Sequence, residues 1–351
     1  MNRKKFFSLL TVLLFAAFLA VSLVACGGGA EEDPDEGTEV TVSSLTVAQD
    51  ATKRTYEEGE DFDSDGLVVN ANMSDGTVEE DVDYSIKSGT ELTTSASYVI
   101  ISYGGRTLYY TITVTYKGNN EKYSVENTDV LDDSPLEGDT YFFLGSSVTY
   151  GYGSDGESMV DFIAKRNSCT CIKEAVSGTT LADIEDSTKG DSYVKRLESY
   201  IASEDRAEEL DVFVCQLSTN DMYDSSTFGE VTDTSVYDID SFDKETTFGA
   251  MEYITALVGE TWDCPVLFYT NNNMGNENYE VMVQAAHDIE DKWESVYVLD
   301  LYNDEEFNDI TSEEEALYMT DNVHPTKAGY LLWWTPEFEE ILADITGADA
   351  E

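Results

Sequence analysis

Apolar residues follow two different patterns along this chain, and the change from one to the other divides it into two parts. Between residues 39 and 117, Val, Ile, Thr and Tyr alternate with polar residues at a period of two, without a helical stripe. This alternation predicts an all-β domain over residues 39–117. Its clearest unit is a hairpin, in which residues 98–103 and 106–116 flank Gly104-Gly105, because glycine tolerates the positive φ angles of a two-residue turn.

The pattern changes after a polar stretch at residues 118–136, which we interpret as a linker. Short apolar runs then alternate with amphipathic segments of helical length; the runs occupy residues 141–144, 210–217, 265–270 and 296–301. This alternation predicts a three-layer α/β sandwich over residues 137–346, in which helices cover both faces of a parallel sheet. Sites in such sheets form beyond the carboxyl ends of the strands, so the residues that follow each run are the candidates for chemistry.

Residues 1–25 resemble an export signal, since three basic residues precede an uncharged apolar run that closes on small residues. The run ends in Leu-Val-Ala before Cys26, which resembles the lipobox of bacterial lipoproteins. That resemblance implies cleavage before Cys26, a diacylglycerol on its sulfur, and anchoring to the outer face of the bacterial cell membrane. An uncut membrane helix is the alternative, because about 20 apolar residues also span a bilayer. Residues 26–38 are predicted to form an acidic, solvated tether.

Composition limits the partners and cofactors. Acidic residues number 72 and basic residues 19, for a net charge of -53, so the chain repels phosphate backbones and nucleic acid is not expected as a partner. Only two histidines are present and no Cys/His cluster, so neither a metal nor another cofactor is implied. The cysteines beyond Cys26 lie in or beside predicted strands and are expected as buried free thiols rather than disulfides; they are Cys169, Cys171, Cys215 and Cys264.

Ser147 stands directly after the first apolar run of the α/β part, at a predicted turn from strand to helix. A serine hydroxyl is a weak nucleophile until a base is positioned beside it. Of the two histidines, His287 lies on an amphipathic segment among charged neighbours and is expected as a solvated helix residue. The neighbouring Ser146 is the alternative nucleophile, which the register of the turn disfavours.

His324 occupies a predicted loop. Residues 318–319 before this loop are interpreted as the end of the last strand region, and residues 328–345 after it as a helix. Pro325 suits the first turn of that helix. Asp321 precedes His324 by three residues, so its carboxylate can reach the imidazole on one local turn and fix its tautomer. The sequence therefore predicts a triad of Ser147, Asp321 and His324.

Two further loops offer donors for the oxyanion that forms during acyl transfer. Gly178 follows a further predicted strand, the second in chain order, which lies beside Cys169 and Cys171 between the runs 141–144 and 210–217. The backbone N–H of Gly178 is not screened by a side chain. Asn220 follows the third, in Ser218-Thr219-Asn220-Asp221, and its amide would enter the same crevice.

These four blocks, in this order and each after its own strand, resemble the SGNH, or GDSL-type, hydrolase superfamily over essentially all of residues 137–346. The resemblance implies a flavodoxin-like α/β fold, a nucleophile at Ser147, oxyanion donors at Gly178 and Asn220, and an Asp-x-x-His pair. Two positions depart from the family pattern: Ser146 stands where a carboxylate is usual, and Ser218 where glycine is usual. The β part, with its Gly and Asp-Gly turns, resembles the bacterial immunoglobulin-like domains of surface proteins.

The resemblance implies a surface-anchored serine ester hydrolase that acts through an acyl-serine intermediate. Tethering and the accessory β domain favour a small-molecule or polysaccharide ester, with acetyl groups removed from carbohydrate. Two alternatives stay open at this point. One is a lipid or lysophospholipid acyl hydrolase, and the other is an inactive hydrolase scaffold that serves as a surface binding or adhesion module.

Overall fold

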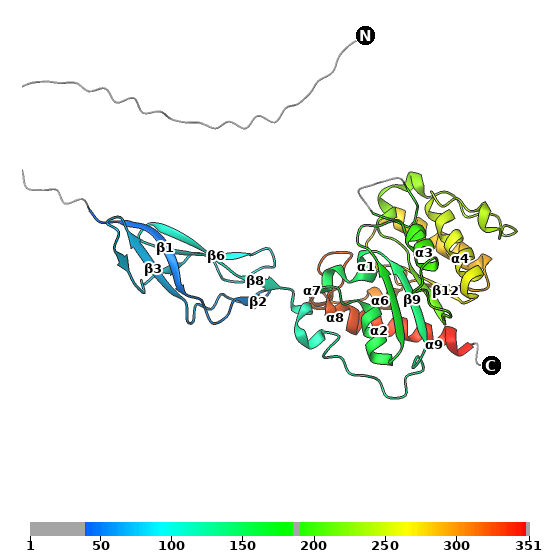
Figure 1. Ribbon diagram of the computed structural model, residues 1–351, viewed down its shortest axis with the longest axis horizontal. Coiled ribbons are helices and arrows are strands. Elements are labelled where there is room, and N and C mark those ends of the chain that lie inside the picture. Colours follow the sequence, from blue (N-terminus) through cyan, green and yellow to red (C-terminus); the bar gives the residue numbers. More distant parts are fainter. Residues whose placement is uncertain (1–38, 185–189, 349–351) are drawn as a thin grey trace, which may run out of the picture.

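The computed structural model describes residues 39–184 and 190–348, which form an elongated β part followed by an α/β part (Figure 1). The predicted export signal, the lipid attachment site at Cys26 and the acidic tether lie outside the described residues. Among the described residues, no helix combines the length and the apolar character that a membrane span requires.

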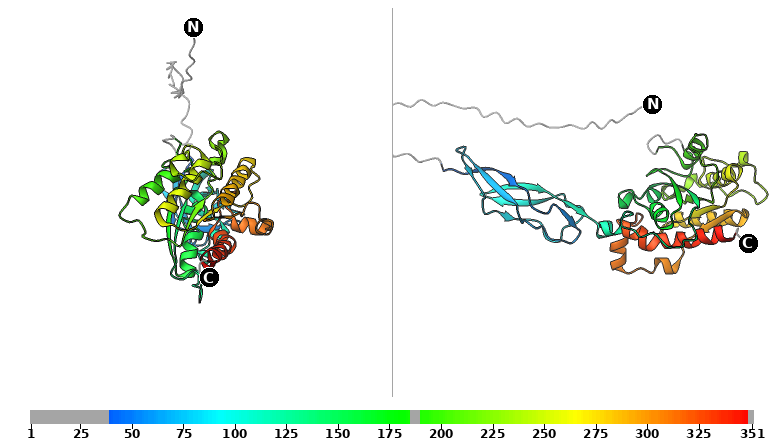
Figure 2. Two further views of the ribbon diagram at one scale, coloured as in Figure 1. Left: turned by 90° about the vertical axis from the view of Figure 1, so that its right-hand side faces the viewer. Right: turned by 60° about the horizontal axis from the view of Figure 1, so that its bottom comes forward.

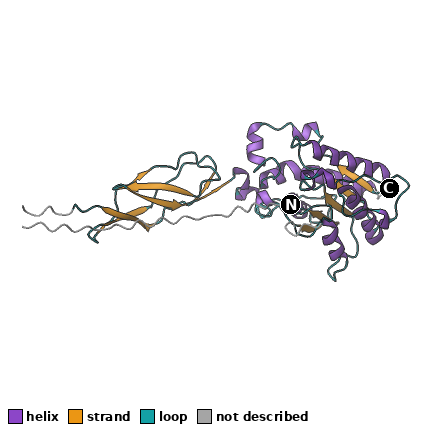
Figure 3. Cartoon of the chain, turned by 90° about the horizontal axis from the view of Figure 1, so that it is seen from above, coloured by secondary structure: helices purple, strands orange, loops and turns teal. Residues whose placement is uncertain are grey.

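In the N-terminal part, within the described residues 39–116, the regular elements are all short strands (Figure 3). Its strands are β1 (Val42–Gln49), β2 (Thr55–Glu57), β3 (Val68–Met73), β4 (Val78–Glu79), β5 (Ser85–Ile86), β6 (Tyr98–Tyr103), β7 (Arg106–Thr111) and β8 (Thr113–Thr115). They pair in the orders β1-β3-β4, β5-β6-β7 and β2-β8. Alternate side chains such as Val69, Ala71, Val99 and Ile101 are fully buried, which is the period of two that the sequence shows. The immunoglobulin-like assignment stays a prediction.

The predicted glycine hairpin is confirmed. Strands β6 and β7 pair antiparallel from Tyr98↔Thr111 to Tyr103↔Arg106, and Gly104 and Gly105 close the turn with φ of +53° and +75°. At Gly104 the left-handed backbone is combined with a close approach, because a Cβ there would lie 2.2 Å from Cγ2 of Val42 on β1. Glycine at this position therefore lets the hairpin turn pack against the other sheet.

The C-terminal part contains the predicted parallel sheet, with order β10-β9-β11-β12-β13. Its strands are β9 (Thr140–Gly145), β10 (Thr170–Ala175), β11 (Val212–Gln216), β12 (Val266–Tyr269) and β13 (Val296–Leu299). Neighbouring residues of β9 point into different cores: Phe142 packs with one set of helices and Phe143 with the other, and both are fully buried. Burial on both faces explains why these strands are uninterrupted apolar runs instead of alternating ones.

Helices cover both faces of the sheet, as the views in Figure 2 show. One face carries α3 (Tyr193–Ile201), α4 (Thr247–Trp262) and α5 (Glu277–Lys292), and the other carries α2 (Met159–Asn167) and α9 (Thr335–Ala348). Because β10 lies on one side of β9 and the later strands on the other, the strand order reverses between β9 and β11, and sites of such sheets form at the carboxyl ends of the strands at this point. Residues that follow these two strands thus meet.

The segment around the predicted histidine differs from expectation in two ways. Tyr318 ends helix α7 (Ser312–Tyr318), so the last strand region predicted there is wrong, and only an isolated bridge joins Met319 to Pro325. The helix that follows begins with α8 (Lys327–Gly329) and continues through a π-helical turn at Tyr330–Trp334 into α9. Its cap is Thr326, whose Oγ1 accepts from the N–H of Gly329 at 3.1 Å, so Pro325 precedes the helix and is not in its first turn.

The fit at the hairpin turn predicts unequal costs for two neighbouring substitutions. Gly104→Ala should lower the free energy of unfolding of the β part by about 1–3 kcal/mol, because the new Cβ meets Val42. Gly105→Ala, where a Cβ meets nothing within 4 Å, should cost only the backbone strain of about 1 kcal/mol. Far-UV circular dichroism measures both, and equal losses would contradict the steric argument. Tryptophan fluorescence should not change, since the four tryptophans all lie in the α/β part.

Candidate active site

Ser147 begins helix α1 (Ser147–Tyr150) directly after β9 and is 7% exposed. Its Oγ lies 2.8 Å from Nε2 of His324. Ser146, the residue before it, is fully buried and its hydroxyl faces the side-chain oxygen of Gln216 at 3.3 Å. The hydroxyl that meets the imidazole is therefore that of Ser147 and not that of its neighbour.

Asp321 holds the other side of the imidazole. Nδ1 of His324 lies 2.9 Å from Oδ2 and 3.1 Å from Oδ1 of Asp321, and Oδ1 also accepts from the backbone N–H groups of Val323 and His324, each at 2.8 Å. Burial raises the pKa of the Asp321 carboxyl, but the hydrogen bonds from His324 and the two N–H groups outweigh it and leave that pKa below its usual value. An ionised carboxylate at Nδ1 keeps the proton there, which leaves the Nε2 lone pair free to accept from Ser147.

The two predicted oxyanion donors lie on connected loops. Asn220 Nδ2 donates to the carbonyl oxygen of Thr179 at 2.9 Å, and Thr179 directly follows Gly178. Gly178 is exposed, with φ of +83°, and a Cβ there would meet nothing within 4 Å. The structure thus ties the Asn220 amide to the loop of Gly178. Their donation to an oxyanion stays a prediction.

Ser218, which replaces the glycine usual in this motif, is accommodated by hydrogen bonds. It is fully buried, its Oγ accepts from the backbone N–H of Asn220 at 3.1 Å and donates to the carbonyl oxygen of Thr179 at 3.4 Å. The hydroxyl therefore joins the two loops that carry Gly178 and Asn220.

Gln216, at the end of β11, supplies the acceptor that the turn before the nucleophile would otherwise lack. Its Oε1 accepts from the backbone N–H of Ser146 at 2.8 Å and from Oγ1 of Thr149 at 2.8 Å, and the residue is 1% exposed. The acceptor for this turn is therefore the side-chain amide oxygen of a residue on the neighbouring strand. Nothing in the sequence around Gln216 pointed to this contact.

Arg196 of α3 fastens the ends of β9 and β10 to the donor loop. Its Nη2 donates to the carbonyl oxygen of Gly145 at 2.8 Å and to Oγ1 of Thr179 at 3.2 Å, while Nη1 donates to the carbonyl oxygen of Glu174 at 3.0 Å and to its carboxylate at 3.1 Å. The residue is 8% exposed. A planar guanidinium satisfies several acceptors at once, so one side chain braces the nucleophile turn and the Gly178 loop together.

Asp221, the residue after Asn220, has a similar role for the loop of Asn220. It is 3% exposed, and its carboxylate accepts from the backbone N–H groups of Leu181 at 2.9 Å and Ala182 at 3.1 Å and from Oγ1 of Thr247 at 3.1 Å. Burial raises the pKa of this carboxyl, and the hydrogen bonds it accepts act in the opposite direction. Asp221 thus binds the loop that follows Gly178 to the loop of Asn220.

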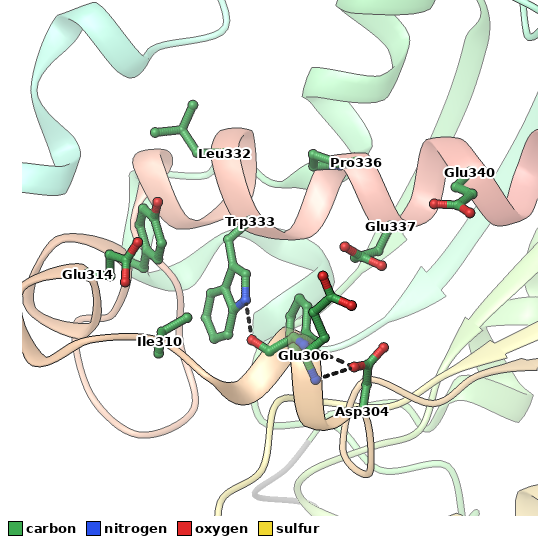
Figure 4. A pocket seen from close by; sticks show the side chains of 11 residues that line it. Asp304, Glu306, Ile310, Glu314, Leu332, Trp333, Pro336, Glu337 and Glu340 are labelled. Carbon is green, nitrogen blue, oxygen red and sulfur yellow. Dashed lines mark hydrogen bonds between the residues drawn. The ribbon is translucent and has the colours of Figure 1, made fainter.

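The base of the Asp321–His324 loop is held by an aromatic stack. The Trp333 ring stacks on Phe307 at 4.4 Å and on Tyr318 at 5.8 Å between centroids, and its Nε1 donates to the carbonyl oxygen of Phe307 at 2.8 Å. Tyr318 precedes the loop and Trp333 follows it, so the stack ties both flanks together. Trp333 also lines a cavity of about 370 Å³. Figure 4 shows the side chains that line it with Trp333, among them the carboxylates of Glu306 and Glu337.

His287 takes no part in this arrangement. It lies on α5 with its side chain 36% exposed, so it is half-buried and not solvated as the sequence suggested. Its Nδ1 faces Glu290 at 2.9 Å and its Nε2 faces Asp300 at 3.0 Å. Burial lowers the pKa of His287, but the hydrogen bonds to the two carboxylates outweigh it and raise that pKa above its usual value. The residue links α5 to the end of β13 through its hydrogen bonds to Glu290 and Asp300.

Within residues 39–184 and 190–348, no group of three or more His, Cys, Asp or Glu side chains has the arrangement of a metal site. The four described cysteines are free thiols, as the sequence suggested. Cys215 and Cys264 are buried as expected, whereas Cys169 and Cys171 are only half-buried, with their sulfurs 3.8 Å apart.

A serine at the carboxyl end of a parallel strand, hydrogen-bonded to a His–Asp pair, defines the class of the protein as a serine hydrolase. Residues 143–332, more than half of the chain, match the model of the GDSL-like lipase/acylhydrolase family. The chain belongs to this family and is a serine esterase.

Solved structures of similar fold include a protein from Lactobacillus plantarum with 19% identity and a TM-score of 0.44, for which the match covers 60% of this chain and 98% of that one. A carbohydrate acetylesterase family member from Sinorhizobium meliloti has 18% identity and a TM-score of 0.41 over 60% and 99% of the two chains. An acetyl xylan esterase from Geobacillus stearothermophilus has 14% identity and a TM-score of 0.40 over 59% and 96%. No curated protein matches the chain.

Arg196 donates to five acceptors, four through Nη1 and Nη2 and the carbonyl oxygen of Asp191 through Nε, so lysine is not expected to replace it. Arg196→Lys keeps the charge but loses the fork geometry, so the free energy of unfolding of the α/β part should fall by about 1–3 kcal/mol. Urea unfolding followed by tryptophan fluorescence measures this domain alone. The control is Lys195→Met on the same helix, where a 45% exposed ammonium pairs with Asp183 and a change of no more than about 0.5 kcal/mol is expected. Equal effects of both substitutions would refute the role of the fork.

Proposed function

We propose that this protein is a surface-anchored esterase that removes acetyl groups from carbohydrate, with Ser147 as nucleophile, His324 as general base and Asp321 as the group that orients His324. The observation that carries the proposal is the unbroken chain of hydrogen bonds from Asp321 through both imidazole nitrogens to the Ser147 hydroxyl. Gly178 and Asn220 donate to the oxyanion. The predicted lipid at Cys26 and the tether 26–38 hold the enzyme at the outer face of the cell membrane, with the immunoglobulin-like domain 39–117 as spacer.

The reaction proceeds in two steps. Ser147 Oγ attacks the ester carbonyl carbon while His324 Nε2 takes the hydroxyl proton, and the tetrahedral oxyanion accepts hydrogen bonds from the Gly178 and Asn220 donors. The carbon–oxygen bond to the alcohol breaks, and His324 returns the proton to the departing oxygen. Water then attacks the acyl-serine with His324 again as base, which releases the carboxylic acid and restores Ser147.

Exposed tyrosines around the triad favour a sugar ester over a lipid. The ring of Tyr152 lies 5.1 Å from the ring of His324 and the residue is 63% exposed, and Tyr150 and Tyr223 are also exposed on the loops of Ser147 and Asn220. A tyrosine presents an apolar ring with a polar tip, which suits stacking against the C–H face of a sugar that also offers hydroxyl groups. A lysophospholipid acyl hydrolase is the competing function, and a preference for long acyl chains would reveal it.

The hydrogen-bond chain predicts opposite results at two adjacent serines. Ser147→Ala should lower kcat for 4-nitrophenyl acetate by at least about 10³-fold, because no acyl-enzyme forms. Ser146→Ala should keep kcat within about threefold, since Gln216 still accepts from the backbone N–H of residue 146. A fluorophosphonate probe should label the wild type and Ser146→Ala but not Ser147→Ala. Equal turnover by wild type and Ser147→Ala would move the nucleophile elsewhere.

The position of Tyr152 predicts how the substrate class can be tested. Tyr152→Ala should lower kcat/KM for acetylated oligosaccharides by about tenfold, the loss of one aromatic contact, and leave that for 4-nitrophenyl acetate within about twofold. Tyr152→Phe keeps the ring and should behave as the wild type on both substrates. If the wild type prefers long-chain nitrophenyl esters to acetyl esters, the carbohydrate proposal is wrong and the lipid alternative stands.

A further inference from the structure

The short helical turn η1 (Lys117–Asn119), which follows the last strand of the β part, lies against the base of the Asp321–His324 loop. Gly118 is buried there, and a Cβ on it would lie 1.9 Å from the carbonyl oxygen of Leu317 and 2.2 Å from Oγ1 of Thr326. Leu317 and Thr326 flank the loop on its two sides, and Thr326 Oγ1 donates to Leu317 O at 2.7 Å. The backbone at Gly118 therefore fits closely onto the two ends of the loop.

The next residue, Asn119, joins this loop to the loop of the nucleophile. Its Nδ2 donates to the carbonyl oxygen of Gly153 at 2.8 Å, and its Oδ1 accepts from the backbone N–H of Lys327 at 2.9 Å. Gly153 lies in η3 (Tyr152–Ser154), just after the helix that Ser147 begins, and Lys327 lies three residues after His324. The side chain of Asn119 thus joins the segment that follows Ser147 to the segment that follows His324. These are the residues whose Oγ and Nε2 atoms lie 2.8 Å apart in the triad.

The two segments also touch without an intervening side chain. A Cβ on Gly153 would lie 2.6 Å from the carbonyl oxygen of Pro325 and 3.1 Å from Cβ of His324. The backbone of one catalytic segment is therefore packed directly on that of the other. Any opening between them translates into a change in the distance between Ser147 Oγ and His324 Nε2, because neither side chain has a long stem to compensate.

A second contact from the same region supports this arrangement. The backbone N–H of Val125 donates to Oε2 of Glu157 at 2.9 Å, and Oε1 of Glu157 lies 3.8 Å from Nζ of Lys327, which is 7% exposed. The stretch predicted as a linker thus contacts the nucleophile side and the base side of the site at more than one point. A flexible connector would make no such contacts.

We infer that Asn119 is a positioning residue of the esterase, which holds His324 against Ser147 through its bonds to Gly153 and Lys327. The residue lies outside the stretch 143–332 that matches the family, so the chain completes its site with a residue from the region that joins the two domains. The inference rests on the proposed roles of Ser147 and His324. It gives the region around residue 119 a part in the reaction, where the sequence suggested only a spacer.

The experiment compares full-length variants with 4-nitrophenyl acetate as substrate. Asn119→Ala should lower kcat by about tenfold and leave KM within about twofold, because small errors of placement slow the chemical step more than they weaken the binding of a small ester. The rate at which a fluorophosphonate labels Ser147 should fall by the same factor. Asn119→Asp keeps the acceptor for Lys327 but cannot donate to Gly153, so it should lose activity as well; it carries the same test if Asn119→Ala does not fold.

The matched control is Asn127→Ala. Asn127 belongs to the same connecting stretch, but its side chain bonds only within that stretch, to the carbonyl oxygen of Glu121 at 2.7 Å and to Oγ of Ser124 at 3.1 Å. This variant should keep the kcat of the wild type. The inference is overturned if both Asn119 variants keep wild-type kcat and labelling rate, or if Asn127→Ala loses as much kcat as they do. Loss of activity in Ser147→Ala with full activity in Asn119→Ala would remove this inference and leave the proposed function intact.

Discussion

The contact between Ser147 Oγ and His324 Nε2 is the constraint on which the rest of the α/β part depends. The two residues are 177 positions apart, and a hydrogen bond of 2.8 Å between short side chains requires that their backbones be placed to a fraction of an ångström. The parallel sheet places only one of the two partners, because Ser147 directly follows β9 while His324 lies between α7 and α8. Polar side chains buried behind the site then fix the loops around it: Gln216 and Arg196 hold the turn before Ser147, and Asp221 joins the loops of Gly178 and Asn220.

These buried braces also show how a strongly acidic chain uses its few cations. Basic residues number only 19 against 72 acidic ones, yet Arg196, Lys292 and Lys327 are all buried. Lys292 forms an ion pair with Glu252 at 2.6 Å in which both side chains are fully buried. Removal of one partner from such a pair costs about 3–5 kcal/mol, because a buried charge stays behind unpaired. Substitution of exposed charged residues therefore costs little stability, whereas substitution of these buried cations costs much.

The sequence was most informative where function depends on local spacing. Short apolar runs located the four predicted strands, and the three-residue interval from Asp321 to His324 was enough to pair them, because both partners lie on one turn of the chain. It was misleading at Tyr318-Met319, where two apolar residues suggested the end of a strand. Tyr318 is instead the last residue of helix α7, which is capped at its start. It was silent about Gln216, Arg196 and Asn119, whose partners are brought near only by the fold. A single polar side chain of this kind leaves no repeat in the sequence from which its partner could be predicted.

Gly118 and Asn119 bear on how such a protein is assembled in evolution. Accessory domains are commonly gained, lost and exchanged as modules, and the natural place to join them is a connection that neither module needs. Here the connection packs closely against the hydrolase domain, because there is no room for a Cβ at Gly118 and the side chain of Asn119 bonds to two loops of that domain. A lineage that replaces the β domain has to recombine ahead of residue 117. The point of recombination then lies about twenty residues ahead of residue 137, where the change in apolar pattern places the start of the α/β domain.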